Sequence, residues 1–252
     1  MLLENRRIIV TGGANGIAAA GVRAFALEGA RVVSLDIDDA AGESIAAEAG
    51  AAAYYHCDVS NRAEVQSVFA RCATELGGLD VLVNAAGNEA ACPAENIPDQ
   101  DWDRVFDVHV KGTLYTNQTA FPYLKEGGGR IINFGSAAGI RGQRGSAHYS
   151  AAKGAIMAWT RTVAGEWAQY GITVNSFVPA IWTPMYEGFR SRLSREQLAA
   201  HDAQMQGAVP LGGKLGNPDH DAAPVLVFLA SEMSRFVTGQ AVPVDGGMVM
   251  LG

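Results

Sequence analysis

The stretch RIIVTGGANGI at residues 7–17 decides the fold, because an apolar run passes directly into a glycine-rich turn. Arg7–Val10 is predicted to form a strand, and Gly16–Glu28 follows with helical periodicity. Glycines allow a tight turn, and the free N–H groups that begin the next helix can bind a pyrophosphate. A glycine cluster alone could be an ordinary left-handed turn, so its place between strand and helix is what indicates a nucleotide site. The residues assigned to that site are Gly12, Asn15, Gly16 and Ile17.

Short apolar strands and longer helical patterns alternate along the rest of the chain. The predicted strands are Arg31–Leu35, Ala52–His56, Leu79–Val83, Arg130–Phe134, Ile172–Phe177 and Ala241–Val244. The predicted helices are Ala40–Ala49, Ala63–Leu76, a long one from about Gln100 to Leu124, and Ser150–Gln169. Strands that are almost continuously apolar are buried on both faces, as in a parallel sheet. The pattern therefore predicts a doubly wound α/β sheet, whose ligands bind at the carboxyl ends of the strands.

One segment, residues 182–216, departs from this alternation and mixes large apolar residues with charged ones. It is predicted to be a helical excursion over the sheet edge, covering the substrate, within a single domain of residues 1–252. Its apolar side chains could line a pocket or simply pack the excursion onto the core. These side chains are Trp182, Met185, Tyr186 and Phe189.

The composition limits the class of protein. The chain has 252 residues, of which 48% are hydrophobic and 18% charged, which suits the core of one α/β domain. Its formal charge is −7 and its basic residues are scattered, which argues against a nucleic-acid partner.

The cysteines and the apolar runs exclude further classes. Cys57, Cys72 and Cys92 lack paired spacing, and no CxxC or HExxH motif occurs, so neither a disulfide framework nor a metal site is predicted. The amino-terminal MLLENRRIIV lacks the apolar core of a signal peptide, and no run of 18 apolar residues is present. We therefore expect a cytoplasmic protein that does not enter a membrane.

An acidic residue marks the end of the second strand. Asp36 lies about 20 residues beyond the glycines, where a carboxylate can accept both ribose hydroxyls of adenosine and so select NAD. The alternative is a solvated acid in a turn, because Asp38 and Asp39 follow. The position of Asp36 directly after the apolar run favours the cofactor role.

Two further strand ends carry candidate cofactor residues. After the third strand, the Asp58 side chain could accept from an adenine amino group, with the Val59 amide nearby, or could have only a local role. After the fourth strand comes a turn of small residues that would let a cofactor ribose lie against backbone, or that simply ends the strand. Its residues are Asn84, Ala85, Ala86 and Gly87.

The catalytic candidates lie in the second half of the chain. Tyr149 and Lys153 are four residues apart in a helical segment and so share one face. Carbonyl reduction needs a proton donor at the oxygen while hydride reaches the carbon. A phenol of ordinary pKa, about 10, is a poor base at neutral pH, and a nearby ammonium lowers that pKa. Ser136, after the fifth strand, can hold the substrate oxygen. A Tyr-x-x-x-Lys pair is common on helix surfaces, so the pair by itself does not indicate catalysis.

Taken together, the motifs TGGANGI, NAAG, Ser136, YSAAK, TVNSFVPA and VDGG resemble those of the short-chain dehydrogenase/reductase family over essentially all 252 residues. The resemblance implies a single Rossmann-like domain with a seven-stranded parallel sheet and helices on both faces. It implies that Tyr149 is the acid/base, that Lys153 lowers its pKa and grips the nicotinamide ribose, and that Ser136 orients the substrate. Tyr149 and Lys153 thus also contact the cofactor. It further implies a homotetramer.

The sequence departs from the family pattern at several positions. Ala18 replaces the third glycine, and its methyl is expected to crowd the helix–strand contact. His109 stands where the family often has an Asn that supports a water linking Lys153 to solvent. His109 could fill this role or be a packing residue. The stretch from Pro179 to Thr183 is one residue short, but Thr183 should still bind the nicotinamide carboxamide, with Ile181 packed nearby.

Other residues are further candidates for the site. His148 could edge the substrate pocket, but a solvent-facing helix start is favoured. Cys92 is expected to be an inert thiol near the mouth of the site, because nothing beside it would lower its pKa. Glu89 and Gln143 are possible polar contacts for substrate.

The motifs indicate an NAD-dependent enzyme that interconverts a secondary alcohol and a ketone. The alternatives are an NAD-binding sensor or scaffold without catalysis, and a nucleotide-sugar epimerase or dehydratase. Intact Ser136, Tyr149 and Lys153 argue against the first, and the chain length of 252 residues leaves little room for the substrate region of the second.

Overall fold

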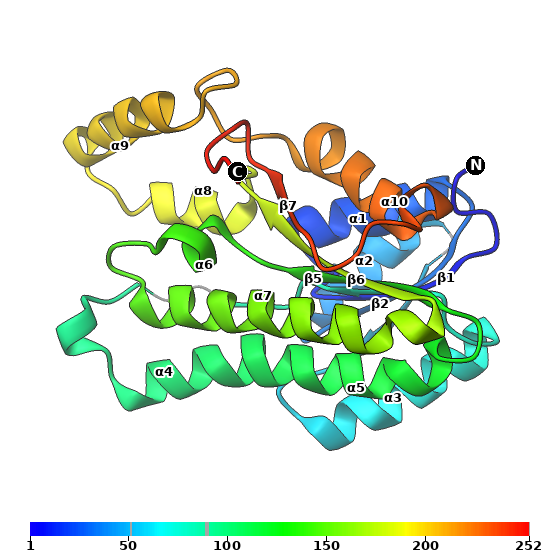
Figure 1. Ribbon diagram of the computed structural model, residues 1–252. Helices are drawn as coiled ribbons and strands as arrows, with labels where there is room; N and C mark the ends of the chain where they lie inside the picture. Colours follow the sequence, from blue (N-terminus) through cyan, green and yellow to red (C-terminus); the bar gives the residue numbers. More distant parts are fainter. Residues whose placement is uncertain (51, 89–90, 252) are drawn as a thin grey trace.

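The computed structural model describes residues 1–50, 52–88 and 91–251, and its centre is a seven-stranded sheet flanked by helices (Figure 1). The strand order is β3-β2-β1-β4-β5-β6-β7, and every neighbouring pair is parallel. The order reverses between β1 and β4, which is where such sheets bind ligands. The predicted doubly wound α/β fold is therefore confirmed. The strands are β1 (Arg7–Thr11), β2 (Arg31–Asp36), β3 (Ala52–His56), β4 (Val81–Asn84), β5 (Gly129–Phe134), β6 (Ile172–Pro179) and β7 (Ala241–Val244).

The helices cover both faces of the sheet (Figure 1). They are α1 (Gly16–Leu27), α2 (Asp39–Ala49), α3 (Arg62–Leu76), α4 (Asp99–Phe106), α5 (Gly112–Leu124), α6 (Ala137–Arg141), α7 (Ala147–Trp167), α8 (Pro184–Arg190), α9 (Arg195–Ala208) and α10 (Ala223–Ala230). The sequence did not predict α6 and α10. Helix α10 is almost wholly apolar, so no helical periodicity marks it, and α6 is only five residues long.

Alternate residues of β1 enter different hydrophobic clusters. Ile9 packs with residues of α3, α5 and α7, including Phe69, on one face. Ile8 and Val10 pack with residues of α1 and α10, including Phe25, on the other face. This alternation is the two-residue period of a strand, and burial on both sides explains why β1 is an unbroken apolar run.

The long helix predicted from about Gln100 to Leu124 contains a change of winding. Helices α4 and α5 are joined by a π-helical segment, Asp107–Lys111, that includes His109. An extra residue in a turn changes which face the following side chains take, and π-helical turns are frequent at functional sites. His109 is buried there, with 3% of its surface exposed.

The predicted excursion of residues 182–216 is helical, as expected, and contains α8 and α9. It leaves and rejoins the sheet at one place, because the Trp182 N–H donates to the Gly216 carbonyl and the Gly216 N–H donates to the Ala180 carbonyl, at 2.8 and 3.1 Å. No described residue of either helix is fully buried. The buried residue of this part of the excursion, Val209, directly follows α9.

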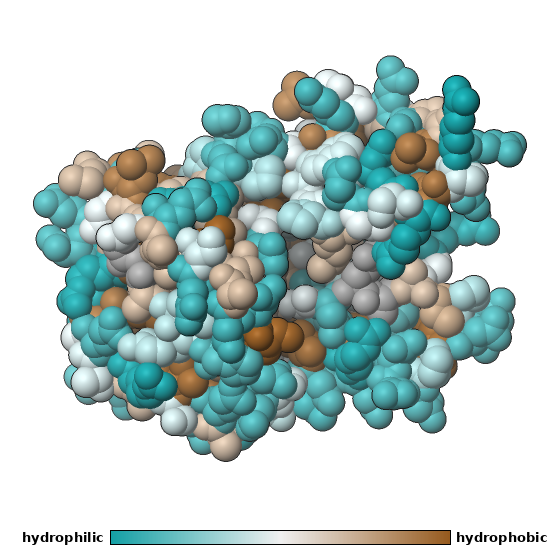
Figure 2. Space-filling model, turned by 180° about the vertical axis from the view of Figure 1, so that it is seen from behind, coloured by the Kyte–Doolittle hydropathy of each residue, from teal (hydrophilic) through white to brown (hydrophobic). Residues whose placement is uncertain are grey.

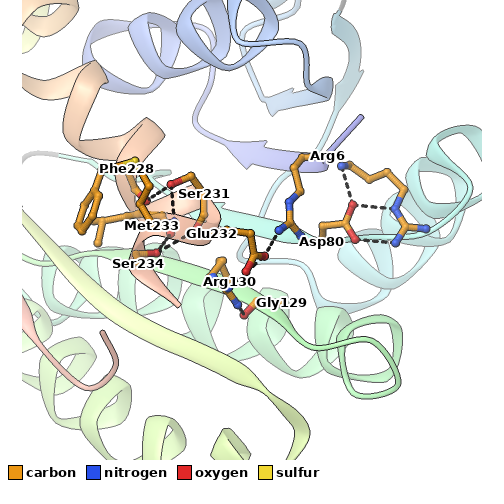
Figure 3. Close-up of polar contacts among 11 residues, drawn as sticks. Arg6, Asp80, Gly129, Arg130, Phe228, Ser231, Glu232, Met233 and Ser234 are labelled. Carbon is orange, nitrogen blue, oxygen red and sulfur yellow. Dashed lines mark hydrogen bonds and ion pairs between the residues drawn. The ribbon is translucent and has the colours of Figure 1, made fainter. Parts of the chain in front are cut away.

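Charged side chains tie the amino ends of the strands together, opposite the ligand-binding edge. Glu232 pairs with both Arg6 and Arg130, and the Arg130 contact measures 3.3 Å (Figure 3). Burial lowers the pKa of Arg130, so the Glu232 carboxylate compensates a charge that is held largely out of water. The rear face of the molecule is mostly hydrophilic, with hydrophobic residues scattered over it (Figure 2).

Candidate active site

A cavity of about 530 Å³ opens at the carboxyl ends of the strands. Its wall contains residues of the glycine turn, the end of β2, the turn after β4, the π-helical segment, α7 and the end of β6. The sequence-predicted residues that line it are Asn15, Gly16, Ile17, Asp36, Ala85, Gly87, His109, Ser136, Tyr149, Lys153, Pro179 and Thr183. The fold thus brings both groups of candidates, for cofactor and for catalysis, to one place.

Other predicted residues support this wall from behind. Gly12 has a φ of +72°, and a Cβ there would lie 2.6 Å from the Ala86 nitrogen, so only glycine lets the two turns meet. Ala86 in turn donates its N–H to Thr11 Oγ1 at 3.3 Å. Asn84 is buried, and its side-chain amide donates to Asn133 Oδ1 at 2.8 Å.

Three predicted cofactor residues have visible local roles away from the cavity wall. Asp58 Oδ1 accepts from the N–H and the hydroxyl of Ser60, at 2.9 and 2.7 Å. Val59 and Ile181 are buried in hydrophobic clusters. Their contacts with a cofactor stay predictions.

Asp36 joins the second strand to the glycine turn. One carboxylate oxygen accepts the Ala14 N–H at 3.0 Å, and the other accepts the N–H groups of Ile37 and Asp38 at 2.8 and 3.1 Å. The carboxylate therefore lies beside the turn and on the cavity wall, where an adenosine ribose would lie. This geometry fits a dinucleotide.

Lys153 lies at the other end of the cavity. Its Nζ donates to the Phe134 carbonyl at 2.8 Å and lies 5.7 Å from the centre of the Tyr149 ring. Burial lowers the pKa of Lys153 to about 7. The ammonium is thus held by a backbone oxygen beside the phenol, and its protonation responds to charge that develops nearby.

Ser136 follows β5 and begins α6. Its Oγ accepts the Ala138 N–H at 3.1 Å, which leaves the hydroxyl proton available for a substrate oxygen. A Cβ on Gly139 would lie 2.7 Å from the Lys153 carbonyl carbon, so this glycine lets α6 approach α7. Backbone packing thereby fixes Ser136 relative to the Tyr149–Lys153 face.

His109 faces the same cavity. Its Nε2 lies 3.2 Å from the Asn88 nitrogen and 2.9 Å from the Asn88 oxygen, and its ring meets the Tyr149 ring edge-on at 5.4 Å. Burial, and then the charge of Lys153, lower the pKa of His109 to about 3. His109 is therefore neutral at physiological pH, and its Nδ1 has no partner among the described residues.

Comparisons with known proteins agree with this arrangement. A family model described as enoyl-(acyl carrier protein) reductase matches residues 12–249. The chain is 35% identical to a 3-oxoacyl-[acyl-carrier-protein] reductase of Thermotoga maritima, over 99% of this chain and 100% of that protein. It is 34% identical to a meso-2,3-butanediol dehydrogenase of Serratia marcescens, over 98% and 96%. A solved short-chain dehydrogenase/reductase of Brucella melitensis, described as a glucose/ribitol dehydrogenase, superposes with a TM-score of 0.90 at 33% identity, over 99% of each chain.

The chain belongs to the short-chain dehydrogenase/reductase family. It is an oxidoreductase by this membership, and the dehydrogenases of the family use nicotinamide cofactors. No helix in the described residues has the length and apolarity needed to cross a bilayer.

The structure corrects the prediction that His148 faces solvent. His148 is fully buried, because the first turn of α7 packs against α4 and the π-helical segment. Neither ring nitrogen has a partner among the described residues. Cys92 is partly buried and donates its N–H to the Gly145 carbonyl at 2.7 Å. Glu89 lies outside the described residues.

Among the large apolar residues of the excursion, Met185 lines the cavity. Tyr186 and Phe189 pack around His201, and the Tyr186 hydroxyl lies 2.8 Å from His201 Nε2. Trp182 meets Tyr186 edge-on, so these three rings pack against one another and His201 within the excursion.

Sequence reasoning missed several lining residues. Asn88 contacts His109, and Phe134, Gly135 and Pro184 contribute to the wall. Ser146 also lines it, and its closeness to Tyr149 in the sequence was the available signal.

Proposed function

We propose that this protein transfers hydride reversibly between NAD(H) and a secondary alcohol or ketone, using Ser136, Tyr149 and Lys153. One observation carries the proposal: the three side chains converge on a cavity whose far end holds Asp36. The proposal has further support in relatives named as a butanediol dehydrogenase and a 3-oxoacyl reductase.

The bound nicotinamide supplies or accepts the hydride. In reduction, the Tyr149 hydroxyl donates its proton to the carbonyl oxygen while the Ser136 hydroxyl donates a hydrogen bond to the same oxygen. The phenolate left on Tyr149 is stabilised by the Lys153 ammonium, which the Phe134 carbonyl holds beside it. In oxidation the same phenolate takes the alcohol proton. In this proposal Lys153 and Tyr149 also contact the nicotinamide ribose.

The choice of NAD over NADP rests on Asp36. The carboxylate already accepts the Ala14 N–H, so it points toward the glycine turn. A ribose hydroxyl can donate to it, whereas a 2′-phosphate would bring like charges together. Neither Ile37 nor Asp38 offers a positive charge to the phosphate.

We further propose that residues 1–252 act as one domain, with residues 182–216 over the substrate, in a cytoplasmic homotetramer. Light scattering of the purified protein tests the assembly.

The experiment that tests the proposed function is a screen of cyclic, aromatic, steroidal and sugar alcohols with NAD, following NADH absorbance. NADH formation with a secondary alcohol, lost in Lys153→Met, supports it. A folded protein that binds NAD but reacts with no alcohol or ketone contradicts it.

A further inference from the structure

Two polar side chains on the cavity wall have no role in the proposed hydride transfer. Gln143 and Ser146 lie in the segment that joins α6 to α7, and both line the cavity. Among the described residues, neither the Gln143 side-chain amide nor the Ser146 hydroxyl has a hydrogen-bond partner. Polar groups on a binding-site wall that are free within the protein are available to a ligand.

Ser146 lies directly before α7, the helix that contains Tyr149 and Lys153. Its backbone is not helical, with φ −147° and ψ 48°, and only two residues separate it from Tyr149. Both residues line the same cavity, so a molecule whose oxygen reaches Tyr149 brings a neighbouring group close to Ser146. The Ser146 side chain makes no capping hydrogen bond to α7, so helix formation does not require its hydroxyl.

Backbone contacts hold the segment that carries both side chains. The Gln143 N–H donates to Ser150 Oγ at 3.0 Å, and the Ser146 N–H donates to the Gln143 carbonyl at 3.2 Å. The Cys92 N–H donates to the Gly145 carbonyl at 2.7 Å, which ties the segment to the chain that follows β4. The two side chains are thus presented from a fixed backbone, as recognition of a small ligand requires.

The rest of this wall presents both apolar and polar groups to a substrate. Met185 and Pro184 supply apolar surface, but His109 and Asn88 add polar atoms to the same cavity. Ser146 is only 5% exposed, so an apolar group over it would leave its hydroxyl without water or partner. Covering a polar group in this way is unfavourable, because the group loses its hydrogen bonds to water.

We propose that the substrate carries a second hydroxyl or carbonyl oxygen on the carbon next to the reacting one, and that Ser146 and Gln143 bind this oxygen. The Ser146 hydroxyl can donate or accept, and the Gln143 amide can do both at once, so the pair binds either oxidation state of the neighbouring carbon. The inference rests on the proposed function, since it names the substrate class of the same site.

The experiment compares matched alcohols with equal carbon skeletons. It measures kcat/KM with saturating NAD for cis-cyclohexane-1,2-diol against cyclohexanol, and for butane-2,3-diol against butan-2-ol. The expected result is at least about tenfold higher kcat/KM for the diols, because a site that binds a substrate hydroxyl discriminates against analogues without it. Equal or higher values for the mono-alcohols overturn the inference and leave the proposed function intact. If none of these alcohols transfers hydride to NAD, both the inference and the proposed function are contradicted.

Variants then assign the discrimination to the two residues. Ser146→Ala combined with Gln143→Leu should lower kcat/KM for the diols at least about tenfold more than for the mono-alcohols. Gln66→Leu, the same chemical change on an exposed face of α3, should leave the ratio unchanged. Retention of the wild-type ratio in the double variant overturns the assignment. The single variant Ser146→Thr keeps the hydroxyl and should retain the preference for diols. Loss of this preference would count against the role of the hydroxyl.

Discussion

Gly87 lies so close to His109 that a Cβ on the glycine would be 2.5 Å from His109 Cε1. The imidazole occupies the space that a side chain at position 87 would need. It lies beside Tyr149 and contacts the Asn88 backbone, so the turn after β4, the π-helical segment and the catalytic phenol form one packed unit. The two positions should therefore be coupled in function.

We predict that Gly87→Ala lowers kcat at least about tenfold, whereas His109→Asn keeps most activity. Overpacking of this kind costs about 1–3 kcal/mol, and a methyl against the ring displaces His109 or the turn. The smaller Asn should relieve the clash, so the double variant Gly87→Ala/His109→Asn should be more active than Gly87→Ala alone. Steady-state kinetics of the four proteins checks this. Additive losses would mean that the two residues act independently, and a folded but inactive His109→Asn would assign the imidazole a specific chemical role.

The pKa of His109 makes stability depend on acidity. The pKa falls from 6.5 to about 3 on folding, so the folded state excludes a proton that the unfolded state binds below pH 6.5. This contribution to the free energy of unfolding is complete above pH 6.5 and is lost as the pH falls toward 3. His109→Asn should therefore flatten the decline in stability between pH 6.5 and 4. Urea unfolding at several pH values measures it, and parallel declines in both proteins would contradict it.

Much of the fold could be predicted from the sequence, because buried strand residues such as Ile8–Val10 are apolar on both faces. Much of the site could be predicted because residues such as Asp36 and Ser136 come at or directly after the ends of strands. Residues whose position depends on packing could not. His148 was expected in solvent because nothing in its neighbours shows that the first turn of α7 packs inward. The π-helical winding at His109 leaves no periodic signal, and Ser146 is marked only by its spacing from Tyr149.

Alcohol oxidation should be faster at alkaline pH. Tyr149 must be a phenolate to take the alcohol proton, and the fraction of phenolate rises with pH until its pKa is passed. Burial lowers the pKa of Lys153 to about 7, so a negative charge on Tyr149 is needed to keep the ammonium protonated at alkaline pH. We predict that kcat for oxidation rises from pH 7 to pH 10, with hydride transfer rate-limiting as judged by a deuterium isotope effect. A flat profile under that condition would contradict the acid/base assignment.

The preference for NAD over NADP should be on the order of 10² or more in kcat/KM, because like charges at close range cost several kcal/mol. Asp36→Ala with Ile37→Arg should narrow or reverse it by removing the repulsion and adding a partner for the phosphate. Asp39→Ala, a removal of similar charge outside the cavity wall, is the control and should leave the preference in place. Equal use of both cofactors by the wild type would mean that Asp36 does not meet the ribose.

The most direct test of the account is the single-turnover rate of hydride transfer in Tyr149→Phe, measured with NAD binding in the same protein. The substitution removes the proton-carrying hydroxyl and keeps the ring beside His109 and Lys153. General acid/base catalysis contributes about 10²–10⁴-fold, so the account predicts a fall of that size with NAD affinity largely retained. A folded variant that keeps more than about a tenth of the wild-type rate would contradict the assignment of Tyr149 as the acid/base.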